Sequence, residues 1–283
     1  MNKDNIIGID LGGTHVRAGV VREGVLSKIE SARIPSSGTV DEVLQVIFNL
    51  VDPLANQHIN AIGIGVPSVV DVEKGIVYDV QNIPSWKEVP LKELMEKRYG
   101  HPVFINNDAN CFALGEKYFG KGKNFHSMIG MTIGTGLGAG IIINDKLYAG
   151  VNCGAGEFGM VEYLDKYYEY YASGQFFENC YQTNGELVFK KAQDGDPLSL
   201  MIFEELGTHL GNAIRMILYT YCPELIVIGG SISKSYSLFQ KTMWERIHTY
   251  VFSNTLNQFH LEISELENPG ILGAASLYYD SQF

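Results

Sequence analysis

The residues best suited to chemistry stand at the end of an apolar stretch, "VFINNDAN". Asn107 and Asp108 lie there between a predicted strand and a predicted helix. In α/β proteins, strand ends beside a cleft are where reactive side chains gather. An aspartate at this place can accept the proton of a substrate hydroxyl that attacks a γ-phosphate, while the asparagine orients that hydroxyl. The alternative is structural, because Asp108 would also serve as the N-cap of the helix.

Two glycine-rich turns interrupt strand-like runs, "GIDLGGTHVRAGVV" at 8–21 and "GMTIGTGLGAGIII" at 130–143. Glycine lets the backbone approach a ligand closely, and successive N–H groups in such a turn can cradle phosphate. One Gly-Gly pair between strands is usually only a hairpin turn. Plain turns need neither the threonine hydroxyls nor the repetition, so the pair of turns favours two phosphate-binding loops.

Asp10 precedes the first turn and has two interpretations. It can cap the turn by bonding nearby backbone groups. In a phosphate site it would instead organise Mg²⁺ or the waters around the ion. The second glycine turn favours the phosphate interpretation.

A third glycine-rich stretch, "GAGEFGMVE", contains Glu157 and Glu162, and Glu169 follows it. Carboxylate oxygens accept hydrogen bonds from hydroxyl groups, so acidic side chains near Asn107 are typical of a polyol-binding site. A solvated acidic loop is the alternative, and it is the favoured interpretation for Glu162.

The elements that must position these residues alternate between apolar strands and helices. The first half is expected to run from three strands through a helix at 40–54 to the strands "AIGIGVPSVVD" and "PVFINN". The second half repeats the glycine-broken hairpin, continues with a helix-rich stretch from Tyr163 to Tyr221, and adds the strand "ELIVIGGSIS". This repetition predicts two α/β domains facing each other across a cleft. We expect residues 1–108, with a C-terminal helix at about 270–283, to form one domain and residues 109–269 the other.

Composition excludes several classes of protein. The 283 residues are 46% hydrophobic and carry a formal net charge of −11, which favours a large buried core and disfavours binding to nucleic acid or anionic membranes. No apolar stretch is long enough for a membrane-spanning helix, and no signal peptide is visible. Four widely spaced cysteines are expected to be free thiols. We therefore expect a cytoplasmic protein.

The motifs, taken in order, resemble those of the ROK (repressor, open reading frame, kinase) sugar kinases, within the actin/hexokinase/Hsp70-like ATPase superfamily. The resemblance covers nearly the whole chain. It rests on "DLGGT" at 10–14, "GIGVPSVVD" at 63–71, "NDAN" at 107–110, "GTGLGAG" at 134–140, "AGEFG" at 155–159, "ASG" at 172–174 and "IVIGG" at 226–230.

The resemblance implies two ribonuclease-H-like (actin-like ATPase) α/β domains that close over ATP and a sugar. It implies that Asp108 is the catalytic base and that Asn107, Glu157 and Glu169 bind the sugar, with Ser68 beside the sugar site. Mg²⁺ would arrive with ATP and could be organised by Asp10. The implied nucleotide-binding residues lie in the two glycine loops and after a later strand: Asp10, Gly12, Gly13, Thr14, Thr132, Gly134, Thr135, Gly136, Gly229 and Gly230.

This chain departs from the family where the family usually binds a structural zinc ion. Met160 stands in place of the usual histidine, and no cysteine lies between Cys153 and Cys180. A tetrahedral zinc site needs four nitrogen or sulfur ligands, so we expect no zinc. Losing the histidine also removes one sugar hydrogen bond, worth about 0.5–1.5 kcal/mol. The tyrosines from Tyr163 to Tyr171 are expected to pack the helix that zinc otherwise holds.

The resulting expectation is an ATP-dependent hexose kinase that phosphorylates the 6-hydroxyl of glucose or a related hexose. The alternatives are an N-acetylhexosamine kinase for N-acetylglucosamine or N-acetylmannosamine, another sugar kinase of the family, or a sugar-sensing regulator without a DNA-binding domain. Repressors of the family carry a helix-turn-helix ahead of the first phosphate loop, and only nine residues precede Asp10 here. The resemblance implies a homodimer or larger homo-oligomer.

Overall fold

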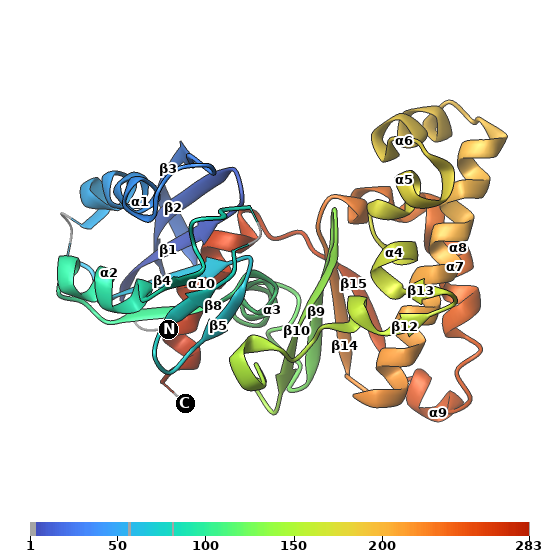
Figure 1. The fold of residues 1–283 in the computed structure, drawn as a ribbon. Helices are drawn as coiled ribbons and strands as arrows, with labels where there is room; N and C mark the ends of the chain where they lie inside the picture. The colour runs from blue at the N-terminus through green and yellow to red at the C-terminus, as the bar shows by residue number, and fades with distance from the viewer. Residues whose placement is uncertain (1–3, 56–57, 81, 283) are drawn as a thin grey trace. The chain divides into compact units, whose positions relative to one another are not determined.

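The computed structural model describes residues 4–55, 58–80 and 82–282, which divide into two compact units (Figure 1). Unit 1 comprises Met1–His126, Gly140–Ala155 and Glu265–Phe283, and unit 2 comprises Ser127–Ala139 and Gly156–Ser264. The sequence predicted a division after Asp108. Unit 1 extends further, since the helix that begins at Asp108 packs on the C-terminal helix of the same unit.

Unit 1 is built on a five-stranded sheet of order β3-β2-β1-β4-β8 and a small sheet of order β5-β6-β7. Strand β1 pairs antiparallel with β2 and parallel with β4, and β4 pairs parallel with β8. The elements of this unit are β1 (Asn5–Leu11), β2 (His15–Arg22), β3 (Val25–Arg33), α1 (Val40–Ala55), β4 (Ala61–Val66), β5 (Val69–Asp71), β6 (Ile76–Tyr78), β7 (Glu88–Val89), α2 (Leu91–Tyr99), β8 (Val103–Asn107), α3 (Asp108–Tyr118), β11 (Lys146–Leu147), the 3₁₀ helix η1 (Val151–Cys153) and α10 (Pro269–Asp280).

Both faces of the central strands are covered, which explains their continuous apolar sequence. Ile7 belongs to the core that α1 fills, whereas its neighbour Ile6 packs with residues of α10. The approach of α10 requires glycine in the sheet: a Cβ at Gly63 would lie 1.9 Å from the carbonyl oxygen of Ala274. Gly63 of the motif "AIGIG" therefore leaves the space in which the backbone of α10 packs on the sheet.

Unit 2 contains most of the second sheet, whose order is β11-β10-β9-β14-β15, with β14 parallel to both β9 and β15. Strand β10 (Leu137–Ile143) begins in unit 2 and ends in unit 1. The other elements of unit 2 are β9 (Met128–Ile133), η2 (Phe158–Met160), β12 (Glu162–Tyr163), β13 (Lys166–Tyr167), α4 (Tyr168–Ala172), α5 (Gln175–Tyr181), α6 (Gly185–Gln193), α7 (Pro197–Thr220), β14 (Leu225–Gly229), η3 (Ile232–Ser235), α8 (Tyr236–Ile247), α9 (Ser253–Leu256) and β15 (His260–Ile263).

The stretch from Tyr163 to Tyr221, predicted to be rich in helices, begins with a hairpin. Strands β12 and β13 pair antiparallel, and Leu164 in their turn has a positive φ of 54°. The tyrosine-rich sequence is compatible with a strand because aromatic residues favour paired, half-buried positions. Helix α4 begins only at Tyr168.

Among the described helices, none combines the length and the apolar character that crossing a membrane would demand. All four cysteines are free: Cys111 and Cys153 are buried, and Cys180 and Cys222 are exposed.

Candidate active site

The carboxyl edge of the unit 1 sheet brings distant predicted residues together. Strands β1, β4 and β8 are parallel, so their carboxyl ends share one edge. In the register of these strands Asp10 is opposite Gly65, and Gly65 is opposite Asn106. Asn107 and Asp108 follow directly, where β8 passes into α3. Asp10, Asn107 and Asp108 therefore belong to one edge of one sheet.

Asn107, and not Asp108, is the N-cap of α3. Its side-chain oxygen accepts a hydrogen bond from the amide of Ala109 at 2.9 Å, and its side-chain nitrogen donates to the carbonyl of Ser68 at 3.3 Å. Asp108 is the first helical residue; its Oδ1 also accepts from the Ala109 amide, and the residue is exposed. The structural role suggested for Asp108 thus falls mainly to its neighbour.

Asn106 is a supporting residue that the sequence did not single out. It is buried, and its Oδ1 accepts from the Asn107 amide, from Asn110 Nδ2 and from the Cys153 thiol, at 2.9, 2.9 and 3.0 Å. These bonds tie the end of β8 to the first turn of α3 and to η1. A polar residue inside an otherwise apolar strand was the one local signal that could have identified it.

Asp10 forms an ion pair with Arg17, whose Nη2 donates to Oδ2 at 2.5 Å. The two residues are directly opposite each other in the β1–β2 hairpin. The predicted phosphate loop, Gly12 to Thr14, joins these strands and is closed by a bond from the Gly12 amide to the His15 carbonyl. A Cβ at Gly13 would lie 2.4 Å from the Asn82 side chain, which accounts for the second glycine.

Ser68 lies just beyond β4. Its hydroxyl donates to the carbonyl oxygen of Tyr78, and its own carbonyl accepts from Asn107. Since the hydroxyl proton is used within the protein, Ser68 has only its oxygen lone pairs to offer a ligand.

The second glycine loop lies in unit 2 and is held by the junction of α4 and α5. The Gly134 amide donates to the Gly136 carbonyl at 3.0 Å, which closes the turn. The Gly174 amide donates to the Gly134 carbonyl at 2.7 Å, and the Ser173 hydroxyl donates to the Thr135 carbonyl at 2.9 Å. Each carbonyl of the loop is thus bound by a main-chain or side-chain donor.

Thr132, Gly229 and Gly230 lie close to this loop. Thr132 of β9 is directly opposite Gly229 of β14, at the carboxyl ends of two parallel strands. Gly230 follows with a positive φ of 87°, and its carbonyl accepts from the Ser233 hydroxyl at 2.8 Å. The structure therefore brings these three of the six predicted nucleotide-binding residues of unit 2 to one sheet edge.

Glu169 and Glu157 are neighbours in unit 2 with different surroundings. Glu169 Oε2 accepts from the Leu137 amide at 2.8 Å, and its Oε1 accepts from Gln175 Nε2 at 2.9 Å. The pKa of Glu157 is raised, first because surrounding protein shields the carboxyl from water and then because Glu169 is negatively charged. Gln175 is a second residue that the sequence did not single out.

The predicted residues thus fall into two sets, one in each unit. No group of three or more His, Cys, Asp or Glu residues within 4–55, 58–80 and 82–282 is arranged to hold a metal ion. The expectation that the protein binds no zinc stays a prediction.

Comparison with known proteins identifies relatives across almost the entire chain. The model of the ROK family matches residues 6–281. A glucokinase of Thermotoga maritima is 30% identical, with 98% of each chain covered. A xylose repressor of Bacillus subtilis is 29% identical over 97% of this chain and 77% of the repressor. Kinases and regulators are therefore both among the similar proteins.

A solved structure supports the fold assignment. The ROK family glucokinase of Streptomyces griseus, crystallised with glucose and AMPPNP, has a TM-score of 0.80 and 29% identity, with 96% of this chain and 98% of that chain covered. The prediction of a two-domain α/β fold of the actin-like ATPase type is confirmed.

Proposed function

Since this chain belongs to the ROK family, we propose that it is an ATP-dependent kinase acting on the 6-hydroxyl of glucose or a related hexose. The observation that carries the proposal is the carboxyl edge of the unit 1 sheet, where the exposed Asp108 stands beside Asn107 and on the same edge as Asp10. A carboxylate that a neighbouring N-cap leaves at the surface is suited to accept a proton from a bound hydroxyl.

In this proposal Asp108 is the general base. A carboxylate oxygen of Asp108 takes the proton of the sugar hydroxyl while the hydroxyl oxygen bonds to the γ-phosphorus. The bond between the γ-phosphorus and the bridging oxygen breaks, and ADP leaves. Asn107 orients the sugar with its second amide N–H, because its first is bound to Ser68 and its oxygen to Ala109. Ser68 acts as a hydrogen-bond acceptor only.

Glu157 and Glu169 are proposed to accept hydrogen bonds from other hydroxyls of the sugar. Their different surroundings favour this role. Glu169 is held by two N–H donors, and Glu157 is partly shielded from water. A hydroxyl donated to Glu157 would replace the solvation that the protein removes. Two carboxylates in one region suit a ligand rich in hydroxyl groups.

The nucleotide is proposed to lie along the glycine loops, with Gly12, Gly13, Thr14, Gly134, Thr135 and Gly136 binding phosphates and with Thr132, Gly229 and Gly230 nearby. Mg²⁺ supplies neutralisation of phosphate charge when it arrives with ATP. The oxygen atoms of Asp10 fit a hard cation. Because Arg17 occupies Oδ2, Oδ1 is the atom we assign to the ion or its waters.

The test is an ADP-release assay with a panel of hexoses and N-acetylhexosamines, followed by NMR to locate the phosphate on the product. We expect turnover with glucose or a near relative. Asp108→Asn is expected to lower kcat by about 10²–10⁴-fold, with a sugar Kd near that of the wild type.

A sugar-sensing regulator is the second candidate, favoured by the 29% identity to a xylose repressor. Saturable sugar binding by calorimetry without ADP release for any member of the panel would favour the regulator and overturn the kinase. Normal turnover by Asp108→Asn would overturn the base assignment alone.

A further inference from the structure

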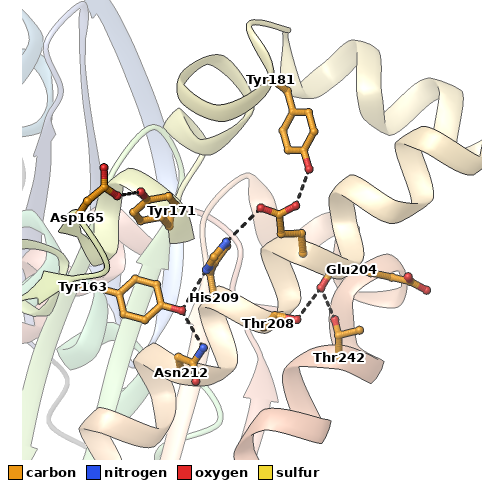
Figure 2. Close-up of polar contacts among 10 residues, drawn as sticks. Tyr163, Asp165, Tyr171, Tyr181, Glu204, Thr208, His209, Asn212 and Thr242 are labelled. Carbon is orange, nitrogen blue, oxygen red and sulfur yellow. Dashed lines mark hydrogen bonds and ion pairs between the residues drawn. The ribbon is translucent and has the colours of Figure 1, made fainter.

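A row of side-chain hydrogen bonds in unit 2 joins the hairpin β12–β13 to helices α7 and α5 (Figure 2). Arg246 of α8 donates from Nε and Nη2 to Asn212 Oδ1, at 3.1 and 3.0 Å. Asn212 Nδ2 donates to the Tyr163 hydroxyl oxygen at 2.8 Å, and that hydroxyl lies 3.1 Å from His209 Nδ1. Asn212 and His209 are both buried on α7.

The neighbours of His209 in this row indicate which of its nitrogens bears the proton. An amide nitrogen can only donate, so Tyr163 accepts from Asn212, and its own proton can be donated to His209 Nδ1. The Glu205 carboxylate beside Nε2 can only accept, which favours the neutral ring that carries its proton on Nε2 and accepts from Tyr163 at Nδ1. Nε2 is 3.5 Å from Glu205 Oε1. Burial lowers the pKa of His209, which favours this neutral form.

The row ends at the Glu205 carboxylate, which also accepts a hydrogen bond from a residue of another helix. Tyr181 of α5 donates from its hydroxyl to Glu205 Oε2. A continuous, directed path thus joins α8, α7, the hairpin and α5.

Ring contacts of Tyr163 connect this row of hydrogen bonds to helix α4. The Tyr163 ring stacks on Tyr168, with centroids 4.3 Å apart and planes 13° apart, and meets the edge of Tyr171 at 5.8 Å. The His209 ring is also 5.1 Å from that of Tyr171. Tyr168 and Tyr171 are three residues apart, so they share one side of the helix.

The other side of α4 faces the second glycine loop. Glu169 accepts from the Leu137 amide, and Ser173, four residues on, donates to the Thr135 carbonyl. A five-residue helix has little stability of its own. Its orientation, and with it that of Glu169, therefore depends on what packs against the tyrosine side.

We propose that His209 is a positioning residue for Glu169. Held in its Nε2–H form between Tyr163 and Glu205, it fixes the tyrosine side of α4 and so presents the Glu169 carboxylate at the loop and at the ligand. The presentation to a sugar rests on the proposed function; the positioning of Glu169 does not.

The central experiment is a double-mutant cycle between His209→Ala and Glu169→Gln, read as kcat/KM for the hexose. Each single variant is expected to lose about 10- to 100-fold, because small displacements of a binding group cost this much. If His209 acts through Glu169, the double variant is no worse than the poorer single one. Losses that multiply would overturn the proposal.

Two further variants separate positioning from general loss of structure. His209→Gln keeps one acceptor and one donor, so it is expected to recover at least part of the activity that His209→Ala loses. Thr208→Ala changes the adjacent residue of α7, a half-buried threonine whose hydroxyl donates to the Glu204 carbonyl, and should leave the kinetics unchanged. Equal losses in His209→Gln and His209→Ala would contradict the hydrogen-bonding role.

A readout that needs no activity keeps this proposal distinct from the proposed function. The Leu137 amide donates to Glu169, so its hydrogen exchange by NMR reports the carboxylate position. We expect faster Leu137 exchange in His209→Ala and no change in Thr208→Ala. Unchanged exchange in His209→Ala would overturn the positioning. A wild-type protein that phosphorylates no hexose would overturn the proposed function, and Leu137 would still decide the role of His209.

Discussion

Neighbouring carboxylates in unit 2 acquire different properties from their partners. Glu169 accepts hydrogen bonds from the Leu137 amide and from Gln175. The pKa of Glu157 is raised by partial shielding from water and by the charge of Glu169. Two glutamates close to each other thus differ, because Glu169 is held by two donors while the carboxyl of Glu157 is partly shielded from water.

The raised pKa of Glu157 predicts a pH dependence of sugar binding. On acidification Glu157 takes up a proton at a higher pH than an ordinary glutamate, and the protonated form is a poorer acceptor for a sugar hydroxyl. Hexose affinity measured by calorimetry is therefore expected to weaken as the pH falls through this raised value. Glu157→Gln should flatten that part of the profile, whereas Glu162→Gln, a change at an exposed neighbour, should keep it.

The same shift has the opposite consequence for stability. Between the unfolded pKa and the raised folded pKa, the folded chain binds more protons than the unfolded chain, so the free energy of unfolding falls as pH rises through this window. Above the raised folded pKa the free energy of unfolding stays at this lower value, because the carboxyl is ionised in both states. Glu157→Gln is expected to raise Tm at neutral pH while weakening sugar binding. A lower Tm would show that the carboxylate is not the destabilising group.

At the scale of elements, the glycine loop and helix α4 form one assembly. The junction of α4 and α5 donates to the carbonyls of Gly134 and Thr135, and the Leu137 amide donates back to Glu169. Bonds in both directions make the loop conformation depend on a helix that follows it in the sequence.

Two glycines of this loop provide a matched comparison. A Cβ at Gly136 would lie 2.6 Å from Glu169 Oε2, whereas the nearest atom to a Cβ at Gly134 is Ser231 Oγ at 3.7 Å. Neither glycine has a positive φ. Gly136→Ala would push aside the Glu169 carboxylate and disturb its hydrogen bonds, so it is expected to lower the free energy of unfolding by about 1 kcal/mol, and Gly134→Ala to change it little. Equal effects in chemical denaturation would contradict a steric role for Glu169.

At the scale of the whole molecule, unit 1 is assembled from three separate stretches of the chain. Its sheet is completed on one face by α10, whose Ile271, Ala274 and Ala275 are fully buried. The core of this unit therefore includes side chains from both ends of the chain.

Gly63→Ala tests the packing of α10 on the sheet of unit 1. The added Cβ would lie 1.9 Å from the Ala274 carbonyl, and backbone cannot move aside as a flexible side chain does. We expect a loss of about 3 kcal/mol or more in stability, with hydrogen exchange accelerated in β4 and α10. Wild-type exchange rates in α10 would mean that the helix is not held by this contact.

The second prediction at this scale concerns metal content. Met160 replaces the usual histidine, no cysteine lies between Cys153 and Cys180, and tyrosines of the hairpin and α4 pack against α7 instead. Elemental analysis of the purified protein is expected to find no stoichiometric zinc, and EDTA should leave Tm unchanged. One zinc ion per chain would refute the prediction.

The sequence by itself determined the α/β class, the two glycine turns and the position of Asp108 after a strand. These features depend on local patterns: apolar runs, glycine at turns and polar residues at strand ends. It also predicted that the tyrosines from Tyr163 to Tyr171 pack a helix; in the structure Tyr168 and Tyr171 belong to α4 and contact Tyr163 and His209. The stretch from Tyr163 to Tyr221 is rich in helices, as predicted, but it opens with the hairpin β12–β13, because strand pairing overrode the local pattern there.

Only the tertiary structure decided the partners of these residues. That Arg17 pairs with Asp10, that Asn106 binds Cys153, and that His209 contacts Tyr163 all depend on strand register or on helix packing between separated segments. A hydrogen bond needs its two atoms within about 3 Å, and nothing in the local sequence specifies which distant side chain meets that condition. The sequence names the groups able to react, and packing decides which of them are held, shielded or paired.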